Sequence, residues 1–204
     1  MNKLDRKLLK LQAKAQDCTS RAKAVKILKK ATKNESNRQL LPPETFKPIQ
    51  DFFLSNLIPW HFNDSIAGVN EDLDNYQLVY NFFDIKNPFK DACPCKYSNL
   101  LRPILTKLSP KYLLRVKANL RPKTSHAQYR GNFHTDMNLG QKTAIFYLNS
   151  NNGYTLFKDD TRVFSQENRL CLFNGHTEHA GTSCTNAKRR VVLNINYIPN
   201  EPLV

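Results

Sequence analysis

Glycine is scarce in this chain of 204 residues, with six in all, and this scarcity excludes a glycine-rich fibre or a low-complexity sequence. Apolar runs such as Phe52-Phe53-Leu54 are far shorter than the roughly 20 residues that a transmembrane helix requires, so we expect no membrane partner. Acidic residues are also few, because 17 Asp and Glu stand against 31 Lys and Arg, a formal net charge of +14. Hydrophobic residues make up 40% of the chain, which suffices for a folded core and excludes a wholly disordered protein.

The cysteine pattern argues against export. The chain has an odd number of cysteines, five, at positions 18, 93, 95, 171 and 184, and its first 15 residues contain five Lys or Arg that interrupt any signal-peptide core. A mitochondrial presequence is disfavoured because the basic residues are mostly Lys and acids are present. We therefore predict free thiols in a reducing, cytoplasmic compartment. Cys93-Pro94-Cys95 has one-residue spacing and no second Cys or His pair nearby, which favours a loop over a metal site.

Residues 1–40 form a basic segment that differs from the rest of the chain. They hold 12 Lys or Arg and 3 Asp or Glu, which leaves 19 and 14 for the other 164 residues, so the net charge divides into +9 and +5. Apolar or small residues recur there at steps of three and four: Leu4, Leu8, Leu11, Ala15, Cys18, Ala22 and Val25. This spacing predicts a helical N-terminal extension. A helix docked on the domain, a coiled-coil dimer and an arm that contacts nucleic acid or the ribosome all stay open, as does the oligomeric state.

Residues 41–204 are predicted to form one domain that is mainly β with supporting α-helices. Amphipathic patterns predict helices over 44–57 and 97–108, and a strand is expected over 76–84. Short β segments separated by turn residues follow, over 112–120, 127–133, 143–149, 161–164, 169–173 and 188–198. Many short strands at this spacing indicate a sandwich or a jelly roll with helices on one face.

A candidate metal site begins at His134 and Asp136. Residues two apart at the end of a strand point to the same side, so the imidazole and the carboxylate can reach one ion. The third ligand has two candidates, His176 and His179. Two imidazoles and one carboxylate occupy one face of an octahedron, an arrangement suited to non-haem Fe(II), which must also bind a co-substrate and O2.

Arg189 opens the last apolar strand, ten residues after His179. Period two places it on one face with Val191 and Leu193, and an arginine on an apolar inward face requires an anionic partner. A dicarboxylate co-substrate would be such a partner, held by a bidentate contact.

In these motifs the sequence resembles the 2-oxoglutarate- and Fe(II)-dependent oxygenases, specifically the prolyl-hydroxylase-like branch and the compact members encoded by marine bacteriophages. The resemblance spans about residues 119–198, extends more weakly back to Pro59-Trp60, and does not cover the first 40 residues. The motifs that carry it are Phe133-His134-Thr135-Asp136, Thr143-Ala144-Ile145-Phe146-Tyr147-Leu148-Asn149, Asn151-Asn152-Gly153-Tyr154-Thr155, Asn168-Arg169, His179-Ala180-Gly181-Thr182 and Arg189-Arg190-Val191-Val192-Leu193-Asn194.

The resemblance implies a double-stranded β-helix that binds Fe(II) through His134, Asp136 and His179. It also implies that Arg189 binds the distal carboxylate of 2-oxoglutarate, with Arg190 as the open alternative, and that Tyr147 donates a hydrogen bond to the same carboxylate. The implied reaction couples oxidative decarboxylation of 2-oxoglutarate by O2 to hydroxylation of a substrate, with ascorbate as a supporting reductant.

The substrate implied by the resemblance is a protein side chain, with proline among the candidates. A nucleic-acid substrate is the alternative that the basic charge permits, but the demethylating branch usually has a second arginine six residues after the first, and this chain has Ile195 there. Two further hypotheses are a jelly-roll binding module without catalysis and a zinc- or manganese-dependent cupin-like hydrolase.

Overall fold

The computed structural model describes residues 39–64, 66, 76–86, 98–137 and 139–200. The predicted basic extension over residues 1–40 lies almost entirely outside the described residues, so its helical character and the domain boundary at residue 41 stay predictions. In the described part of the chain, no helix is both long and apolar enough to span a membrane.

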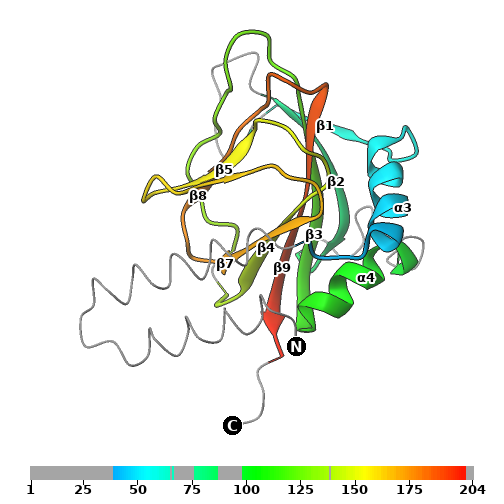
Figure 1. Ribbon diagram of the computed structural model, residues 1–204. Coiled ribbons are helices and arrows are strands. Elements are labelled where there is room, and N and C mark those ends of the chain that lie inside the picture. Colours follow the sequence, from blue (N-terminus) through cyan, green and yellow to red (C-terminus); the bar gives the residue numbers. More distant parts are fainter. Residues whose placement is uncertain (1–38, 65, 67–75, 87–97, 138, 201–204) are drawn as a thin grey trace, which may run out of the picture. The chain divides into compact units, whose positions relative to one another are not determined.

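Two antiparallel sheets form a jelly roll, as predicted, and they face each other across the interior (Figure 1). The large sheet has six strands and the small sheet has three. In spatial order the large sheet contains β1 (His61–Asn63), β2 (Gln77–Asp84), β3 (Pro110–Pro122), β9 (Arg189–Pro199), β4 (Lys142–Tyr147) and β7 (Arg169–Asn174). The small sheet contains β6 (Arg162–Phe164), β5 (Tyr154–Phe157) and β8 (His179–Gly181).

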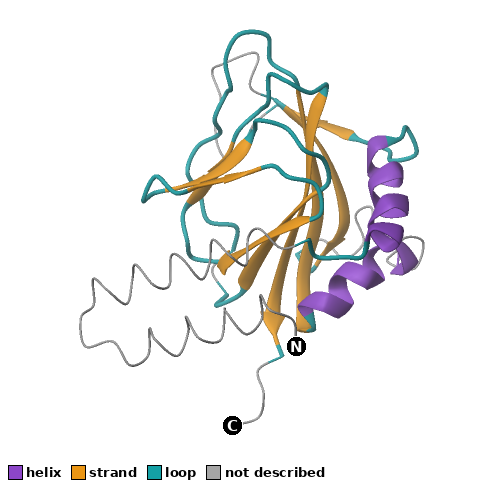
Figure 2. Ribbon diagram, in the orientation of Figure 1, coloured by secondary structure: helices purple, strands orange, loops and turns teal. Residues whose placement is uncertain are grey.

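Two helices, α3 (Pro43–Leu54) and α4 (Ser98–Leu108), cover the outer face of the large sheet (Figure 2). Helix α3 begins with a proline, whose fixed φ suits the first helical turn. Its buried residues Phe46, Ile49 and Phe53 recur at helical spacing and pack in the same core as Ile104 of α4. Burial of each such side chain contributes about 1.5–3 kcal/mol, so this apolar layer anchors the sheet.

Alternation along the central strands separates an apolar outer face from a polar inner face. In β9, Val191, Leu193 and Ile195 lie in the core beneath the helices, whereas Arg190 and Asn194 line the interior of the jelly roll. The expectation that the apolar face points inward, toward the site, is therefore wrong. The helices take the apolar face because they offer it an apolar partner, and the interior receives the polar one.

Most of the predicted elements are present at nearly the predicted positions. Both helices, β2, and the strands β3, β4, β6, β7 and β9 are confirmed. The strand predicted over 127–133 is wrong, because this stretch contains only an isolated bridge between Arg130 and Thr182. The short strands β1 (three residues), β5 (four) and β8 (three) were not predicted.

Candidate metal centre and its pocket

The two histidines of the candidate site are neighbours across an antiparallel bridge. The backbone N–H of His134 donates to the carbonyl of His179 at 3.1 Å, and the N–H of His179 donates to the carbonyl of His134 at 3.0 Å. This pairing brings together residues 45 positions apart and sets their ring centroids 4.7 Å apart. The fold therefore selects His179 over His176, which is exposed and lies outside this cluster.

Asp136 completes a cluster of three potential ligands. Its carboxylate oxygens lie 4.0 Å from Nε2 of His134 and 3.9 Å from Nε2 of His179, and all three ligand atoms lie within 4.8 Å of one another. Asp136 and His179 are each 4% exposed, whereas His134 is 34% exposed. The cluster thus has a buried side and one side open to the pocket.

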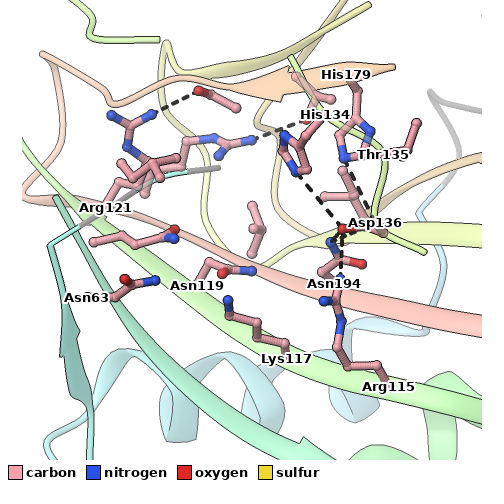
Figure 3. A pocket seen from close by; sticks show the side chains of 17 residues that line it. Asn63, Arg115, Lys117, Asn119, Arg121, His134, Thr135, Asp136, His179 and Asn194 are labelled. Atoms are coloured by element: carbon pink, nitrogen blue, oxygen red, sulfur yellow. Dashed lines mark hydrogen bonds and ion pairs between the residues drawn. The ribbon is translucent and has the colours of Figure 1, made fainter. Parts of the chain in front are cut away.

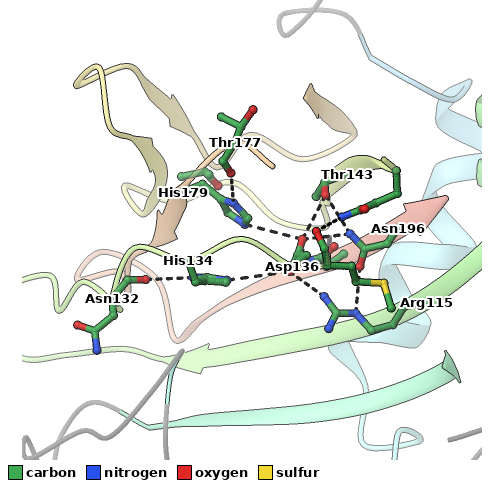
Figure 4. Close-up of polar contacts among 12 residues, drawn as sticks. Arg115, Asn132, His134, Asp136, Thr143, Thr177, His179 and Asn196 are labelled. Atoms are coloured by element: carbon green, nitrogen blue, oxygen red, sulfur yellow. Dashed lines mark hydrogen bonds and ion pairs between the residues drawn. The ribbon is translucent and has the colours of Figure 1, made fainter. Parts of the chain in front are cut away.

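Each histidine is held in the tautomer that metal binding requires. The Nδ1–H of His134 donates to the carbonyl of Asn132 at 3.0 Å, and the Nδ1–H of His179 donates to the carbonyl of Thr177 at 3.1 Å (Figure 4). A carbonyl only accepts, so in the neutral form of each ring the proton lies on Nδ1 and the Nε2 lone pair faces Asp136. Burial lowers the pKa of His179, which favours the neutral, ligating form.

Asp136 is held by a network of donors from the large sheet. Nη2 of Arg115 donates to Oδ1 at 2.7 Å, Nδ2 of Asn196 donates to Oδ2 at 3.1 Å, and Nδ2 of Asn194 contacts both oxygens. The hydroxyl of Thr143 contributes a longer bond of 3.3 Å (Figure 4). Burial alone would raise the pKa of this carboxyl, but Arg115, His179 and the two amides outweigh it, so the pKa lies below its usual value. The carboxylate is therefore charged and fixed in orientation.

A pocket of about 330 Å³ extends from this cluster across the inner face of the large sheet (Figure 3). Alternate residues of β3 form one wall, namely Arg115, Lys117, Asn119 and Arg121. Burial, followed by the charge of Arg190, lowers the pKa of the Arg121 guanidinium to about 9, which leaves it protonated at neutral pH. Burial, followed by the charge of Arg115, lowers the pKa of Lys117. The volume falls at the lower end of the range of about 300–1,000 Å³ typical of small-molecule sites.

Of the two adjacent arginines at the start of β9, Arg190 lines this pocket and Arg189 lies on the opposite face of the strand. Arg190 is 4% exposed, its Nε donates to the Ser165 hydroxyl at 2.7 Å, and its Nη2 donates to the Thr155 hydroxyl at 3.3 Å. Arg189 donates instead to the carbonyl of Leu54 in α3. Arg189 is thus used at the sheet–helix contact and is absent from the described pocket lining.

Gly181 links Arg190 to the metal cluster. It follows His179 by two residues on β8, and a Cβ placed on it would lie 3.4 Å from Nη1 of Arg190. Two residues of a strand span roughly 7 Å, so the guanidinium lies about that far along β8 from His179. A five-carbon dicarboxylate can bridge such a gap, with one end at the metal cluster and the other at Arg190.

Tyr147 lies behind the pocket wall. It is fully buried, its hydroxyl donates to the Thr155 hydroxyl at 2.8 Å, and its ring centroid is 5.6 Å from the Arg190 guanidinium carbon. The predicted contact of Tyr147 with a bound carboxylate would have to form beside Thr155, since Tyr147 is not among the described lining residues.

The β3 wall was missed at the level of sequence. The segment Arg115-Val116-Lys117-Ala118-Asn119-Leu120-Arg121 alternates polar and apolar residues without a break, and that alternation was the available signal. It identifies the two faces of the strand, but only the packing of the helices decides that the polar face lies inside.

Comparisons with known proteins identify the fold. No protein-family model matches the sequence, and no curated protein sequence matches it either. Among solved structures the chain is similar to the non-haem alpha-ketoglutarate-dependent epimerase SnoN from nogalamycin biosynthesis, with 12% identity over 84% of each chain and a TM-score of 0.56.

Two further structures are similar over most of the chain. One is a prolyl hydroxylase from Trichoplax adhaerens in complex with a hypoxia inducible factor peptide fragment, with 14% identity, 91% and 96% of the two chains covered, and a TM-score of 0.52. The other is HygX from Streptomyces hygroscopicus with nickel and 2-oxoglutarate bound, with 13% identity, 79% and 80% covered, and a TM-score of 0.50. At these identities the likeness establishes a shared jelly-roll fold, and the resemblance to bacteriophage-encoded members stays a prediction.

Proposed function

We propose that the protein is an Fe(II)- and 2-oxoglutarate-dependent oxygenase that hydroxylates a protein side chain, with release of succinate and carbon dioxide. The observation that carries the proposal is the pairing of two features in one pocket. A cluster of two imidazoles and a carboxylate lies at one end of the pocket. The buried guanidinium of Arg190 lies beside Gly181, two residues further along β8 than His179 of the cluster.

The donor set fits Fe(II). Two imidazoles whose Nδ1–H groups are held by backbone carbonyls can ligate through Nε2, and together with one carboxylate they leave positions open for a co-substrate and O2. His134, Asp136 and His179 would hold the metal, which when bound supplies the activation of O2 for the coupled oxidation of 2-oxoglutarate and the substrate. The chain's own part is to hold these three groups in place, which the carbonyls of Asn132 and Thr177 do for the histidines.

Arg190 would bind the distal carboxylate of 2-oxoglutarate. Its Nε and Nη2 are already directed by the Ser165 and Thr155 hydroxyls, so the guanidinium is held in one orientation before the co-substrate arrives. Within the described part of the chain no carboxylate pairs with this guanidinium, and the distal carboxylate of 2-oxoglutarate would supply the counter-charge. We assign this role to Arg190 in place of Arg189, with the Tyr147 hydroxyl as a supporting donor through Thr155.

A protein side chain is the proposed substrate. The peptide bound to the Trichoplax prolyl hydroxylase supports it, because that enzyme shares the fold over most of both chains. A nucleic-acid substrate receives less support, since the basic segment that motivated it lies outside the described residues.

The test is aerobic turnover of 2-oxoglutarate by the full chain loaded with Fe(II). We expect succinate formation in the wild type and its loss in His134→Ala, whereas His176→Ala, an exposed histidine outside the cluster, serves as the matched control and retains activity. Mass spectrometry of cell proteins with and without the enzyme should then find peptides heavier by one oxygen atom. Absence of both 2-oxoglutarate binding and turnover in the wild type would refute the oxygenase assignment and leave a binding module or a hydrolase.

A further inference from the structure

We propose that Lys117 forms a subsite for a carboxylate of the primary substrate, distinct from the arginine that holds 2-oxoglutarate. This inference rests on the proposed oxygenase function and specifies the class of substrate: a molecule or side chain that carries a carboxylate close to the carbon that reacts.

The first observation is the charge balance of the pocket. Its described lining contains four cationic side chains, Arg115, Lys117, Arg121 and Arg190, against a single carboxylate, Asp136. A divalent metal and the 2-oxoglutarate dianion would cancel each other's charge, so loading the site leaves this excess of positive charge in place. A low-dielectric cleft with such an excess attracts anions, and the excess remains for the primary substrate.

The second observation is that the other three cations are engaged. Arg115 is paired with Asp136 at 2.7 Å, Arg121 donates to the carbonyl of Gly181 at 2.8 Å, and Arg190 donates to two hydroxyls beside the position proposed for 2-oxoglutarate. The ammonium of Lys117 has no hydrogen-bond or ion-pair partner among the residues that the structure describes. A half-buried ammonium in this state is costly, and a carboxylate would relieve the cost.

The third observation is the position of Lys117 relative to the metal cluster. Lys117 pairs in register with Asn194 of β9, whose amide donates to both oxygens of Asp136. Figure 3 shows Lys117 rising from β3 with Asn119 on one side and Asn194 on the other. Lys117 and the residue that holds Asp136 are therefore neighbours on adjacent strands, with backbones roughly 5 Å apart. A substrate held there would present its neighbouring carbon atoms to the metal.

The subsite is built for one negative charge. It has a single ammonium flanked by neutral amides, which matches a carboxylate better than a phosphate dianion. A carboxylate of this kind occurs both in a free acidic amino acid and in an aspartyl or glutamyl side chain of a peptide, and the experiment distinguishes these sources.

The experiment compares acids with their amides, which have nearly the same shape and differ in charge. The anaerobic full chain is loaded with Fe(II) and 2-oxoglutarate, and binding is followed through the perturbation of the Fe(II)–2-oxoglutarate absorption band. The probes are glutamate against glutamine and aspartate against asparagine, each as the free amino acid and as the N-acetyl, N-methylamide derivative. Binding of the free acids alone identifies a small-molecule substrate, and binding of the blocked acids identifies a side chain; both support the proposal.

We expect the wild type to prefer an acid over its amide by about 10- to 100-fold, the value of one charge-assisted hydrogen bond. Lys117→Met should abolish the preference and leave the affinity for 2-oxoglutarate unchanged, and Lys117→Arg should restore part of it. Lys111→Met is the matched control, because Lys111 is an exposed lysine on the same strand and should have no effect.

Three results would overturn the inference. If acid and amide perturb the absorption band of the wild type equally, or neither perturbs it, Lys117 has only a structural role beside Asn194. A preference that survives in Lys117→Met would place the carboxylate elsewhere, and weaker 2-oxoglutarate binding in that variant would make Lys117 part of the co-substrate site. Failure of the proposed function is distinguishable, because in that case the wild type forms no absorption band with 2-oxoglutarate before any probe is added.

Discussion

The exchange of roles between Arg189 and Arg190 leads to a quantitative prediction. Arg190→Met removes a guanidinium that is 4% exposed and directed by Ser165 and Thr155, and a methionine side chain cannot make a bidentate contact with a carboxylate. Two charge-assisted hydrogen bonds in a buried site contribute about 3–4 kcal/mol, which corresponds to a rise in the Kd for 2-oxoglutarate of about two to three orders of magnitude.

The assay is an anaerobic titration of the Fe(II)-loaded protein with 2-oxoglutarate and with 2-oxopentanoate, which has a methyl group where 2-oxoglutarate has its distal carboxylate. The wild type should prefer 2-oxoglutarate strongly, and Arg190→Met should bind both 2-oxo acids with similar, weak affinity. Because affinity for 2-oxopentanoate reports on the intact metal site, the comparison separates a lost contact from a misfolded variant.

Arg189→Met is the matched control. Its guanidinium donates to the Leu54 carbonyl on the outer face of the sheet, so its loss should cost about 1 kcal/mol of stability and leave the preference for 2-oxoglutarate intact. The reasoning would be refuted if the preference disappeared in Arg189→Met and persisted in Arg190→Met.

Three further predictions concern groups around the site. Gly153→Ala should raise the KM for 2-oxoglutarate and lower the Tm while metal affinity is retained, because its Cβ would lie 2.6 Å from Cδ of Arg190; an unchanged KM would contradict this. Arg115→Met should lower the unfolding free energy of the metal-free protein by about 2 kcal/mol but tighten Mn(II) binding, since the cation no longer competes for Asp136. The pKa of Asp136 is lower in the folded protein than in the unfolded chain, so its charged form stabilises the fold above about pH 4. This stabilisation is lost as the pH falls through the folded-state pKa, and in acid unfolding titrations Arg115→Met should move the loss to higher pH. Burial raises the pKa of Cys171 to about 12, so at pH 8 about one thiol in 10⁴ is ionised, and mass spectrometry should detect iodoacetamide labelling in urea but not in the native protein.

Local patterns sufficed to predict the strands and helices that alternate strongly. The apolar residues at helical spacing in α3, the alternation in β3 and the apolar, β-branched run in β9 predicted these elements within a few residues. The stretch 127–133 contains residues that favour strands but forms only one isolated bridge, because its partner, Thr182, is a single residue of another segment. Pairing partners are a property of the assembled sheets, and no local pattern contains them.

The sequence by itself determined the chemistry available to this protein. It supplied His134 and Asp136 two positions apart, a pair of arginines at the start of the last strand, and a choice of two later histidines. Only the tertiary structure decided among these, since the backbone bridge between His134 and His179 selects the third member of the cluster.

The tertiary structure also decided which of Arg189 and Arg190 lines the pocket, and which of the basic residues behind the net charge of +14 lie in the interior. Alternation divides a strand into two faces, but which face lies inside depends on where the helices dock. Because α3 and α4 cover the apolar face, the cations on the polar faces of β3 and β9, namely Arg115, Lys117, Arg121 and Arg190, line the interior of the jelly roll beside the metal cluster.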